Sequence, residues 1–307
     1  MGERRRRHRA GSSPRDAPAI RIDEEACVRC GACLEICRVG VFVWEGDRVR
    51  PVCPDRCFAC GHCVAVCPVD AVDHPRFPLS DCPRIDAGDL PTLDQLTAAL
   101  RHRRSTRCFA AEGIPREQIE GLLDLGRWAP TASNQQPVDW LVVDDPERIA
   151  ALSCAVLQVL GRLVAVVRNP LLRTLLRLVL GKEAVDLAAR SAAGFADAHR
   201  RSQEGDDVVF HAAPVLLIAH VPRWDRFGRD DAAFASYNVM LAAERMGLGT
   251  CQIGFLQAAL GFSRRLRGSL GLPPGRRAEV ELILGRPKHP FRRWLPRRRP
   301  EIRGLPS

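Results

Sequence analysis

The sequence predicts an α+β protein in two parts, a small cysteine-dense module followed by a larger layered domain of helices and a few strands. The chain has 307 residues, of which 46% are hydrophobic, and this suits two domains, the larger with an apolar core. Most of its 13 cysteines fall in one short stretch. Beyond that stretch, helix-like periodicity alternates with apolar runs typical of buried strands.

The predicted parts follow one another along the chain. Residues 1–19 are basic and lack periodicity, so we expect them to be disordered. Residues 20–78 hold the cysteines and form a module too small to depend on an apolar core alone. Proline and glycine mark residues 79–95 as a linker, and residues 96–307 form the larger domain.

Apolar spacing predicts the elements of the larger domain. Leucines or other apolar residues recur at helical intervals in three segments, and short apolar runs bounded by Pro, Gly or Asp form three more. The expected helices contain residues 93–100, 119–123 and 239–246, and the expected strands are residues 138–143, 215–221 and 280–284. Helices alternating with few strands indicate a layered α+β or α/β domain.

The net charge of +10 comes almost wholly from arginine and permits nucleic acid, anionic membranes or phosphate ligands as partners. No nucleic-acid module accompanies the arginines, so no nucleic-acid partner is expected. No apolar stretch follows the arginines at residues 4–7, so a secretory signal is not indicated and a cytoplasmic location is expected. In a reducing compartment, clustered cysteines point to metals instead of disulfides.

One apolar stretch, residues 155–180, raises the question of a membrane span. Four arginines and the break at Asn169-Pro170 interrupt it, so no transmembrane segment is expected. Its second half is amphipathic, which fits either a helix on a membrane surface or a lid or dimer-covering helix. Packing against the protein is the favoured interpretation.

The small module contains two cysteine motifs with the same spacing. They read Cys27-Val-Arg-Cys30-Gly-Ala-Cys33-Leu-Glu-Ile-Cys37 and Cys57-Phe-Ala-Cys60-Gly-His-Cys63-Val-Ala-Val-Cys67-Pro68. Three thiolates at three-residue intervals on a tight loop can bind three irons of one cubane cluster, while the fourth cysteine of the motif faces away from that cluster. The spacing therefore predicts iron–sulfur clusters, and a pair of zinc sites is the alternative.

Over residues 20–78 these motifs resemble bacterial two-cluster ferredoxins. The resemblance implies two 4Fe-4S clusters with crossed ligation, one held by Cys27, Cys30, Cys33 and Cys67, the other by Cys57, Cys60, Cys63 and Cys37. Arg38 departs from the pattern, because a proline is expected there, but no ligand is lost. The five other cysteines are expected to be ordinary thiols: Cys53, Cys82, Cys108, Cys154 and Cys251.

Three further motifs lie in the larger domain. They read Arg103-Arg104-Ser105-Thr106-Arg107, then Ala129-Pro130-Thr131-Ala132-Ser133-Asn134, then Gly247-Leu-Gly249-Thr250-Cys-Gln-Ile253-Gly254. Arginines offer the fork of donors that a phosphate needs, and glycines let the backbone approach a flat ring. Each motif alone is also typical of an exposed helix end or a helix C-cap.

Their order and spacing resemble the FMN-binding motifs of the nitroreductase family, from about residue 96 to the C-terminus. The resemblance implies a mixed sheet flanked by helices, an FMN cofactor and a homodimer. It places Arg103, Arg104, Ser105 and Arg107 at the FMN phosphate, ribityl chain and N1/O2 edge; Pro130, Thr131, Ala132 and Asn134 at the ring of the partner subunit; and Ile253 and Gly254 near N5. Arg297 and Arg299 resemble a closing phosphate-binding segment.

Residues of about 146–210 exceed what a minimal member of that family needs, and we expect them to form a lid or insert over the open face of the flavin. Phe195, His199, His211 and Tyr237 are candidates to approach the pocket. A single His or aromatic residue more often packs than reacts, so no catalytic residue is assigned.

The leading functional hypothesis is an oxidoreductase in which two 4Fe-4S clusters pass electrons to FMN, which reduces a nitroaromatic, quinone or activated alkene. Ferredoxin or NAD(P)H would supply the electrons, and fusing the module to the reductase raises its effective concentration near the flavin. A dehydrogenase or flavin-destroying enzyme working in reverse is one alternative. A non-catalytic electron carrier or redox sensor is the other.

Overall fold

The computed structural model describes residues 20–183, 185–186, 197–198 and 200–304, so the predicted basic tail of residues 1–19 lies outside the described residues. The chain forms two compact units with the main boundary between Pro91 and Thr92, and Ser133–Gln135 groups with the first unit. Each unit has its own apolar core.

The first unit is built from two small antiparallel sheets and two short helices. Strand β1 (Arg21–Ile22) pairs with β4 (Val72–Asp73), and β2 (Phe42–Glu45) pairs with β3 (Arg48–Pro51). Helices α1 (Ala32–Ile36) and α2 (His62–Ala65) follow the two cysteine loops. The apolar core is small and interleaved with cysteines: Ile20, Val41, Phe42, Val49, Cys63, Val64 and Val72.

Toward its end the first unit makes short 3-10 turns at Leu79–Asp81 and Ala87–Asp89. Helix α3 (Leu93–His102) then opens the second unit, and Thr92 and Gln95 cap it with a reciprocal pair of hydrogen bonds. The predicted helix at residues 93–100 is therefore present, although its leucines are exposed.

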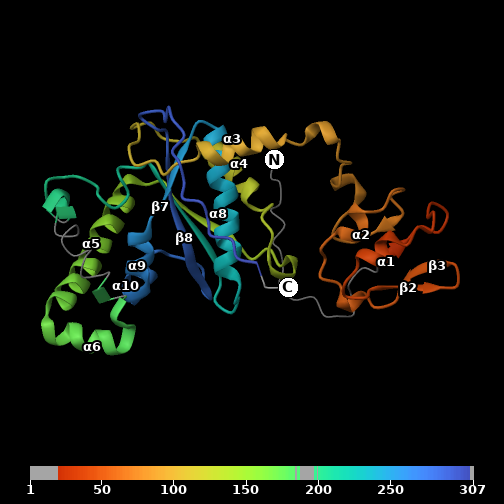
Figure 1. Cartoon of the computed structure of the whole chain (residues 1–307), viewed down its shortest axis with the longest axis horizontal. Helices are drawn as coiled ribbons and strands as arrows, with labels where there is room; N and C mark the ends of the chain where they lie inside the picture. Colours follow the sequence, from red (N-terminus) through yellow and green to blue (C-terminus); the bar gives the residue numbers. More distant parts are fainter. Residues whose placement is uncertain (1–19, 184, 187–196, 199, 305–307) are drawn as a thin grey trace, which may run out of the picture. The chain divides into compact units, whose positions relative to one another are not determined.

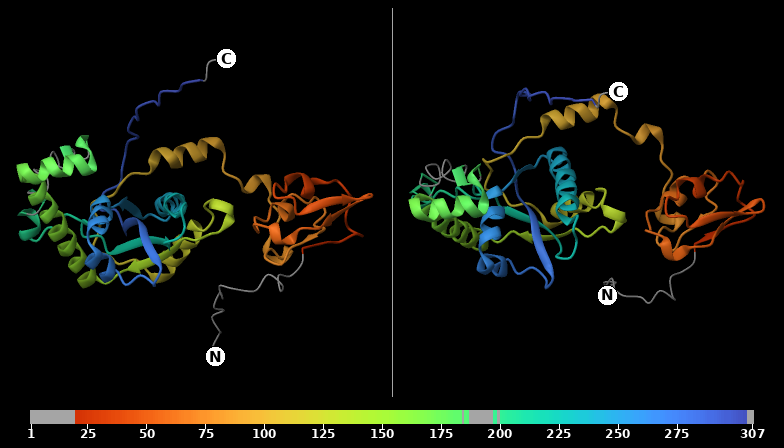
Figure 2. Two further views of the ribbon diagram at one scale, coloured as in Figure 1. Left: turned by 90° about the horizontal axis from the view of Figure 1, so that it is seen from below. Right: turned by 60° about the horizontal axis from the view of Figure 1, so that its bottom comes forward.

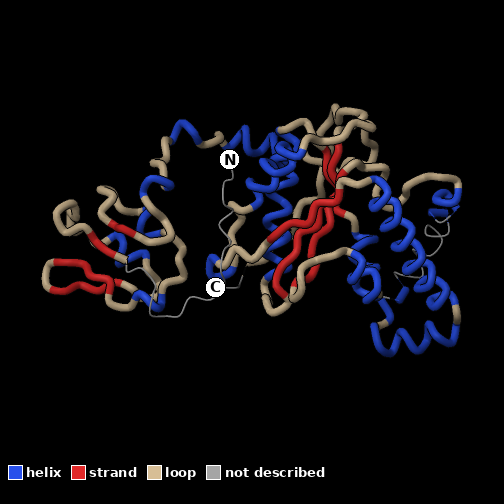
Figure 3. The backbone as a smooth tube through the Cα atoms, turned by 180° about the vertical axis from the view of Figure 1, so that it is seen from behind, coloured by secondary structure: helices blue, strands red, loops and turns tan. Residues whose placement is uncertain are grey.

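The second unit centres on a four-stranded sheet in the order β5-β6-β8-β7. Its strands are β5 (Asp139–Val143), β6 (Val215–Pro222), β7 (Gly249–Gln252) and β8 (Arg276–Gly285). Neighbouring strands pair antiparallel, and a parallel bridge between Ser105 and Thr250 at the β7 edge gives the sheet its mixed character. Figure 3 shows the strands crossing this unit as a twisted layer.

Helices cover both faces of this sheet (Figure 1). Helices α4 (Arg116–Gly126) and α8 (Gly228–Arg245) pack on one face, where Leu217, Ala219 and Leu282 point. Helices α5 (Pro146–Arg168), α9 (Gly254–Phe262) and α10 (Arg264–Ser269) pack on the other, where Leu216, Ile218 and Ile283 point. The alternation follows from the two-residue period of a strand buried on both faces.

The apolar stretch forms two helices, because Asn169 ends α5 and its side chain caps α6 (Pro170–Leu180). Contrary to the sequence expectation, Pro146–Val166 is long and apolar enough by composition to cross a membrane, and only 28% of it is buried in the structure. Most of the interrupting arginines lie after Val166, outside this window. The apolar stretch considered in the sequence began at residue 155 and so left out the first part of the window. The long core helix of a soluble protein passes the same test.

The chain leaves the sheet at Gly285 as an extended segment without further helices or strands in its described part, up to Gly304 (Figure 2).

Candidate cluster and flavin sites

The two cysteine loops have nearly the same backbone. Arg29 and Gly31 in the first loop have φ values of 58° and 75°, and Ala59 and Gly61 in the second have 50° and 75°. A Cβ on Gly31 would lie 3.0 Å from the Trp44 ring, so a larger residue there meets both strain and a clash. Each left-handed glycine turns the chain directly into the helix that follows.

The loops bring the eight motif cysteines into two groups, each around its own cavity. One cavity is lined by three cysteines of the first motif and the last cysteine of the second, namely Cys27, Cys30, Cys33 and Cys67. The other is lined by the complementary set, Cys37, Cys57, Cys60 and Cys63. The grouping is the crossed one, because Cys37, which follows α1, lines the cavity of the second motif, and Cys67, which follows α2, lines the cavity of the first.

The chemistry of both linings suits iron–sulfur ligation. Burial raises the pKa of the Cys33 thiol, and it raises that of Cys63 to about 11, so a metal must displace these protons to bind. The backbone N–H of Val41 points at Cys37 Sγ over 3.4 Å, and that of Ala71 at Cys67 Sγ over 3.2 Å. Among the described residues no three His, Cys, Asp or Glu side chains are grouped for a single metal ion.

Cys53 and Cys82 lie in the same unit but in neither lining. Both are half-buried, and the backbone N–H of Cys53 donates to Val41 O over 3.2 Å. Nothing in the described structure gives either thiol a role.

In the second unit, the arginine motif lies alongside the third motif. Thr106 N donates to Thr250 O over 2.9 Å, which fixes residues 105–107 against the edge strand β7. The chain then continues beside the C-terminal segment, where Ala110 N donates to Arg286 O over 2.9 Å and Lys288 N donates to Cys108 O over 3.0 Å. Three segments that are far apart in the sequence therefore meet at one end of the sheet.

Glu244, which was not among the residues predicted from the sequence, holds the arginine turn in place. Its carboxylate lies 2.9 Å from His102 Nδ1 and 3.3 Å from the backbone nitrogen of Arg104. The Arg104 guanidinium in turn donates to Leu295 O over 3.5 Å. Glu244 lies in the last turn of α8. An acidic residue at such a position is usually exposed to solvent, so the local sequence does not indicate a functional role.

The arginine turn fits a bound mononucleotide. Its donor set of guanidinium and hydroxyl groups is the set that phosphate prefers. The hydroxyls of Thr106 and Thr250 are buried without a hydrogen-bond partner. Gly249 admits Thr106 beside β7, because a Cβ on this glycine would come within 2.4 Å of Thr106 Oγ1.

The second motif lies near the opposite end of α8. Ala132 N donates to the buried Asp231 Oδ1 over 3.2 Å, and Gln136 N donates to Thr131 Oγ1 over 3.0 Å. Asp231 and Glu244 are thirteen residues apart on one helix, which separates the two motifs by about 20 Å. Within one chain, Ala132 is therefore not beside the arginine turn.

Asp231 is a second functional candidate that sequence reasoning missed. Burial raises the pKa of its carboxyl, its hydrogen bond from Ala132 opposes the rise, and its Oδ2 has no partner. Asn134 lies in a 3-10 turn, Ala132–Asn134, in which Ser133 and Asn134 have positive φ values of 52°.

The remaining predicted site residues occupy varied positions. Ile253 is buried and its N–H donates to Glu281 O over 2.9 Å, and Gly254 opens α9 with free space around it. Arg297 and Arg299 are exposed on the C-terminal segment, where Leu295 accepts a hydrogen bond from Arg104. His211 is half-buried, Tyr237 is exposed, and Phe195 and His199 lie outside the described residues.

Comparisons with known proteins match a family model to each of the two parts of the chain. Residues 100–286 match the model of the nitroreductase family, and residues 20–73 match that of a 4Fe-4S dicluster domain. The chain is 30% identical over 217 residues to 4-nitrobenzoate reductase from Nocardioides sp. (strain LMS-CY). The matched region covers 64% of this chain and 82% of that protein.

Solved structures give similar matches. A nitroreductase with bound FMN from Desulfitobacterium hafniense DCB-2 is 18% identical, with a TM-score of 0.49 and coverage of 67% of this chain and 96% of that one. A nitroreductase with bound FMN from Bacteroides fragilis NCTC 9343 is also 18% identical, with a TM-score of 0.43 and coverage of 69% and 97%. By the family match, the chain belongs to the nitroreductase family and is an FMN oxidoreductase that carries a 4Fe-4S domain ahead of its flavin domain.

Proposed function

We propose that the protein is a cytoplasmic homodimer in which two 4Fe-4S clusters pass electrons to FMN, which reduces an electron-poor acceptor. A nitroaromatic is the favoured acceptor, because the curated relative is a 4-nitrobenzoate reductase. Quinones and activated alkenes belong to the same electron-poor class. The observation that carries the proposal is the presence, in one chain, of two crossed four-cysteine groups and a flavin-type arginine turn.

Each part of the chain has a distinct task in this proposal. FMN, when bound, supplies the ability to exchange electrons singly with a cluster and in pairs with an organic acceptor. Arg103, Arg104, Ser105 and Arg107 hold its phosphate and ribityl chain, and Glu244 holds the turn that presents them. The backbone of Ile253 and Gly254 lies at the N5 edge. Arg297 and Arg299 complete the phosphate contacts from the C-terminal segment.

The separation of the motifs supports the proposed homodimer. Ala132 meets α8 at Asp231, about 20 Å along the helix from Glu244, which holds the arginine turn. In this proposal Pro130, Thr131, Ala132 and Asn134 would therefore line the ring bound by the partner subunit. Mixing two double variants tests whether the FMN site is shared between subunits. Arg103→Gln/Arg107→Gln removes contacts to the phosphate and ribityl chain, and Thr131→Ala/Asn134→Ala removes contacts to the ring. Heterodimers that regain FMN, when neither parent binds it, support shared sites; no recovery in verified heterodimers contradicts them.

The main experiment measures composition and then turnover. Protein purified without oxygen is expected to hold about eight irons and one FMN per chain. Reduction of 4-nitrobenzoate is then followed with reduced ferredoxin and, separately, with NAD(P)H as electron donor. A Cys37→Ser/Cys67→Ser variant should lose ferredoxin-driven turnover, whereas full activity in this variant would show that the clusters are not in the electron path.

A further inference from the structure

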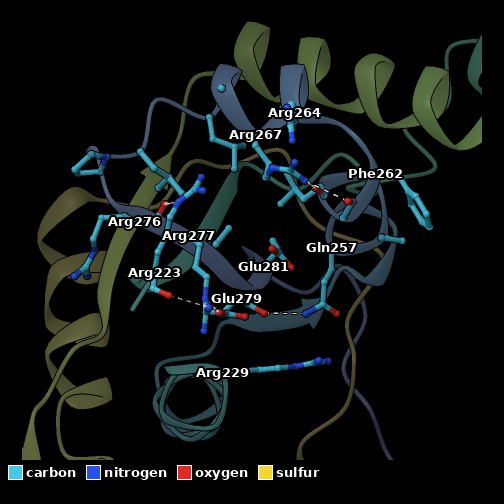
Figure 4. Close-up of a pocket in the computed structure, with 18 of the residues that line it drawn as sticks. Arg223, Arg229, Gln257, Phe262, Arg264, Arg267, Arg276, Arg277, Glu279 and Glu281 are labelled. Carbon is cyan, nitrogen blue, oxygen red and sulfur yellow. Dashed lines mark hydrogen bonds and ion pairs between the residues drawn. The ribbon is translucent and has the colours of Figure 1, made fainter. Parts of the chain in front are cut away.

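A cleft of about 910 Å³ lies beside the start of α9, bounded by α9, α10 and the first half of β8 (Figure 4). It exists because β7 pairs with β8 only as far as Gln252 and Leu282, so Arg276–Glu281 has no strand neighbour on that side. Gly254, the residue proposed to lie at flavin N5, is part of its lining. The charged residues of the lining are six arginines and two glutamates: Arg223, Arg229, Arg264, Arg267, Arg276, Arg277, Glu279 and Glu281.

Glu281 is the unexplained group in this cleft. Its side chain is fully buried, and neither carboxylate oxygen has a hydrogen-bond partner. Burial and the nearby Glu279 raise its pKa to about 8, and Arg229 opposes the rise. At neutral pH the carboxyl is therefore protonated, and its O–H is a buried donor without an acceptor. A buried polar group without a partner costs stability unless a ligand satisfies it.

Most of the arginines already have partners within the protein. Arg277 pairs with Glu279 and donates to Asp225 O, Arg276 pairs with Asp139, and Arg267 donates to Leu260 O. Arg223 donates through Nε to Arg276 O. These arginines shape the cleft and leave little of their hydrogen-bonding capacity for a ligand.

Arg229 and Arg264 differ from the others. Neither has a hydrogen bond or ion pair with any residue that the structure describes, and both are exposed at the cleft. With Glu281 protonated, the lining carries six positive charges and the single negative charge of Glu279. A ligand with an anionic group matches this potential, and a carboxylate also supplies the acceptor that Glu281 lacks.

We propose that the cleft binds the carboxylate of an aromatic acid, with Arg229 as its main ion-pair partner, Arg264 adding positive charge, and Glu281 donating a hydrogen bond. The acceptor reduced by this enzyme is then an anionic aromatic compound whose acid group is held by the charged residues of the cleft, with its reducible group toward Gly254. This assignment of substrate class rests on the proposed function. The binding site itself does not require turnover.

The binding test uses calorimetry on the oxidised holoenzyme at pH 7, with benzoate and its neutral counterpart benzamide as probes. Benzoate is expected to bind at least tenfold more tightly than benzamide. Arg229→Gln should weaken benzoate about tenfold and Arg264→Gln about threefold, while the neighbouring Arg226→Gln and Arg265→Gln should leave it unchanged. Equal effects from cleft and control variants, or no preference for benzoate, would overturn the site.

The role of Glu281 is tested by pH. Above pH 8 its carboxyl ionises and repels the ligand, so benzoate affinity should fall several-fold between pH 7 and pH 9. Glu281→Gln keeps a donor but does not titrate, so this variant should lose most of that fall. A variant whose affinity falls as steeply as that of the wild-type protein would contradict the role of Glu281.

Turnover separates this inference from the proposed function. With 4-nitrobenzoate and 4-nitrobenzamide as acceptors, the acid should have a kcat/KM at least tenfold higher, and Arg229→Gln should abolish the preference. Equal reduction of both compounds would overturn the substrate class and leave the reductase function intact. Binding of benzoate without reduction of any acceptor would leave the site intact and overturn the reductase function.

Discussion

In the cluster module, each predicted site consists of three residues from one short loop and a fourth from the matching loop, whereas the flavin site joins segments far apart in the chain. Thr106 meets Thr250, and Arg104 contacts both Glu244 and Leu295. The module has a small core interleaved with its cysteines. The flavin domain instead buries two extensive apolar layers against its sheet.

This difference indicates that the two units draw their folding free energy from different sources. A small module gains much of its folding free energy from bound metal, and removing the metal should unfold it. The flavin domain is stabilised by burial of apolar side chains, and its site residues depend on that packing for their positions. Metal loss and core mutations should therefore act on different units.

The largest effect is expected from Cys63→Ser. Loss of one buried thiolate should remove one cluster, about half of the bound iron, and destabilise the whole module. Iron content and visible absorption after anaerobic purification measure the loss, and FMN content should stay near that of the wild-type protein. The matched control is Cys53→Ser, which lies outside both groups and should retain all the iron. Equal iron loss in both variants would contradict the assignment of ligands.

A sharper test of crossed ligation compares double variants. Cys27→Ser/Cys67→Ser removes two residues of one group, and Cys27→Ser/Cys37→Ser removes one residue from each. The first should lose about half of the iron and the second nearly all of it. The reverse order would show that each motif holds its own cluster.

The next effect concerns the core of the flavin domain. Leu282→Ala opens a cavity in a fully buried strand and should lower the free energy of unfolding by about 2–5 kcal/mol. Thermal unfolding followed through FMN release should shift to lower temperature, with no change in iron content. Leu93→Ala, at a position that is 77% exposed, should change stability by less than about 0.5 kcal/mol. Iron loss in Leu282→Ala would mean that the units are energetically coupled.

A pH-dependent effect is expected at Glu281. Its folded pKa of about 8 exceeds the ordinary value of 4.5, so the folded state binds an extra proton between these pH values. Stability should therefore fall as the pH rises from about 5 to 8, on the order of 2–5 kcal/mol in total from this group, and then level off. Glu281→Gln should flatten the curve, whereas the exposed Glu117→Gln should not. An unchanged slope in Glu281→Gln would contradict the buried, protonated carboxyl.

The smallest effect is expected from Glu244→Gln. This change keeps the shape of the side chain but weakens its charge-assisted bonds to His102 and Arg104, which hold the arginine turn. FMN affinity should fall about 3–10-fold, corresponding to roughly 1 kcal/mol. Fluorescence titration of the apoprotein with FMN measures it. Glu120→Gln, which breaks an exposed pair with Arg116, should leave FMN affinity unchanged.

The sequence alone located the three strands near residues 138–143, 215–221 and 280–284. A short apolar run bounded by Pro, Gly or Asp in a layered domain is most often a buried strand. It also located the cysteine loops, since four thiols at fixed spacing define a ligand set almost without reference to the rest of the fold. The two-residue strand β1 and the edge strand β7 carry too little apolar pattern to be recognised.

Only the tertiary structure decided which polar residues act. Glu244, Asp231 and Glu281 look like ordinary acidic residues in helices and a strand, and nothing in their local sequence distinguishes them from exposed ones. The partners of Glu244 and Asp231 come from segments roughly a hundred or more residues away. Glu281 has no hydrogen-bond partner and is buried where β8 runs past the end of β7. Burial and charge depend on what packs against a residue, so these properties arise only when distant segments meet.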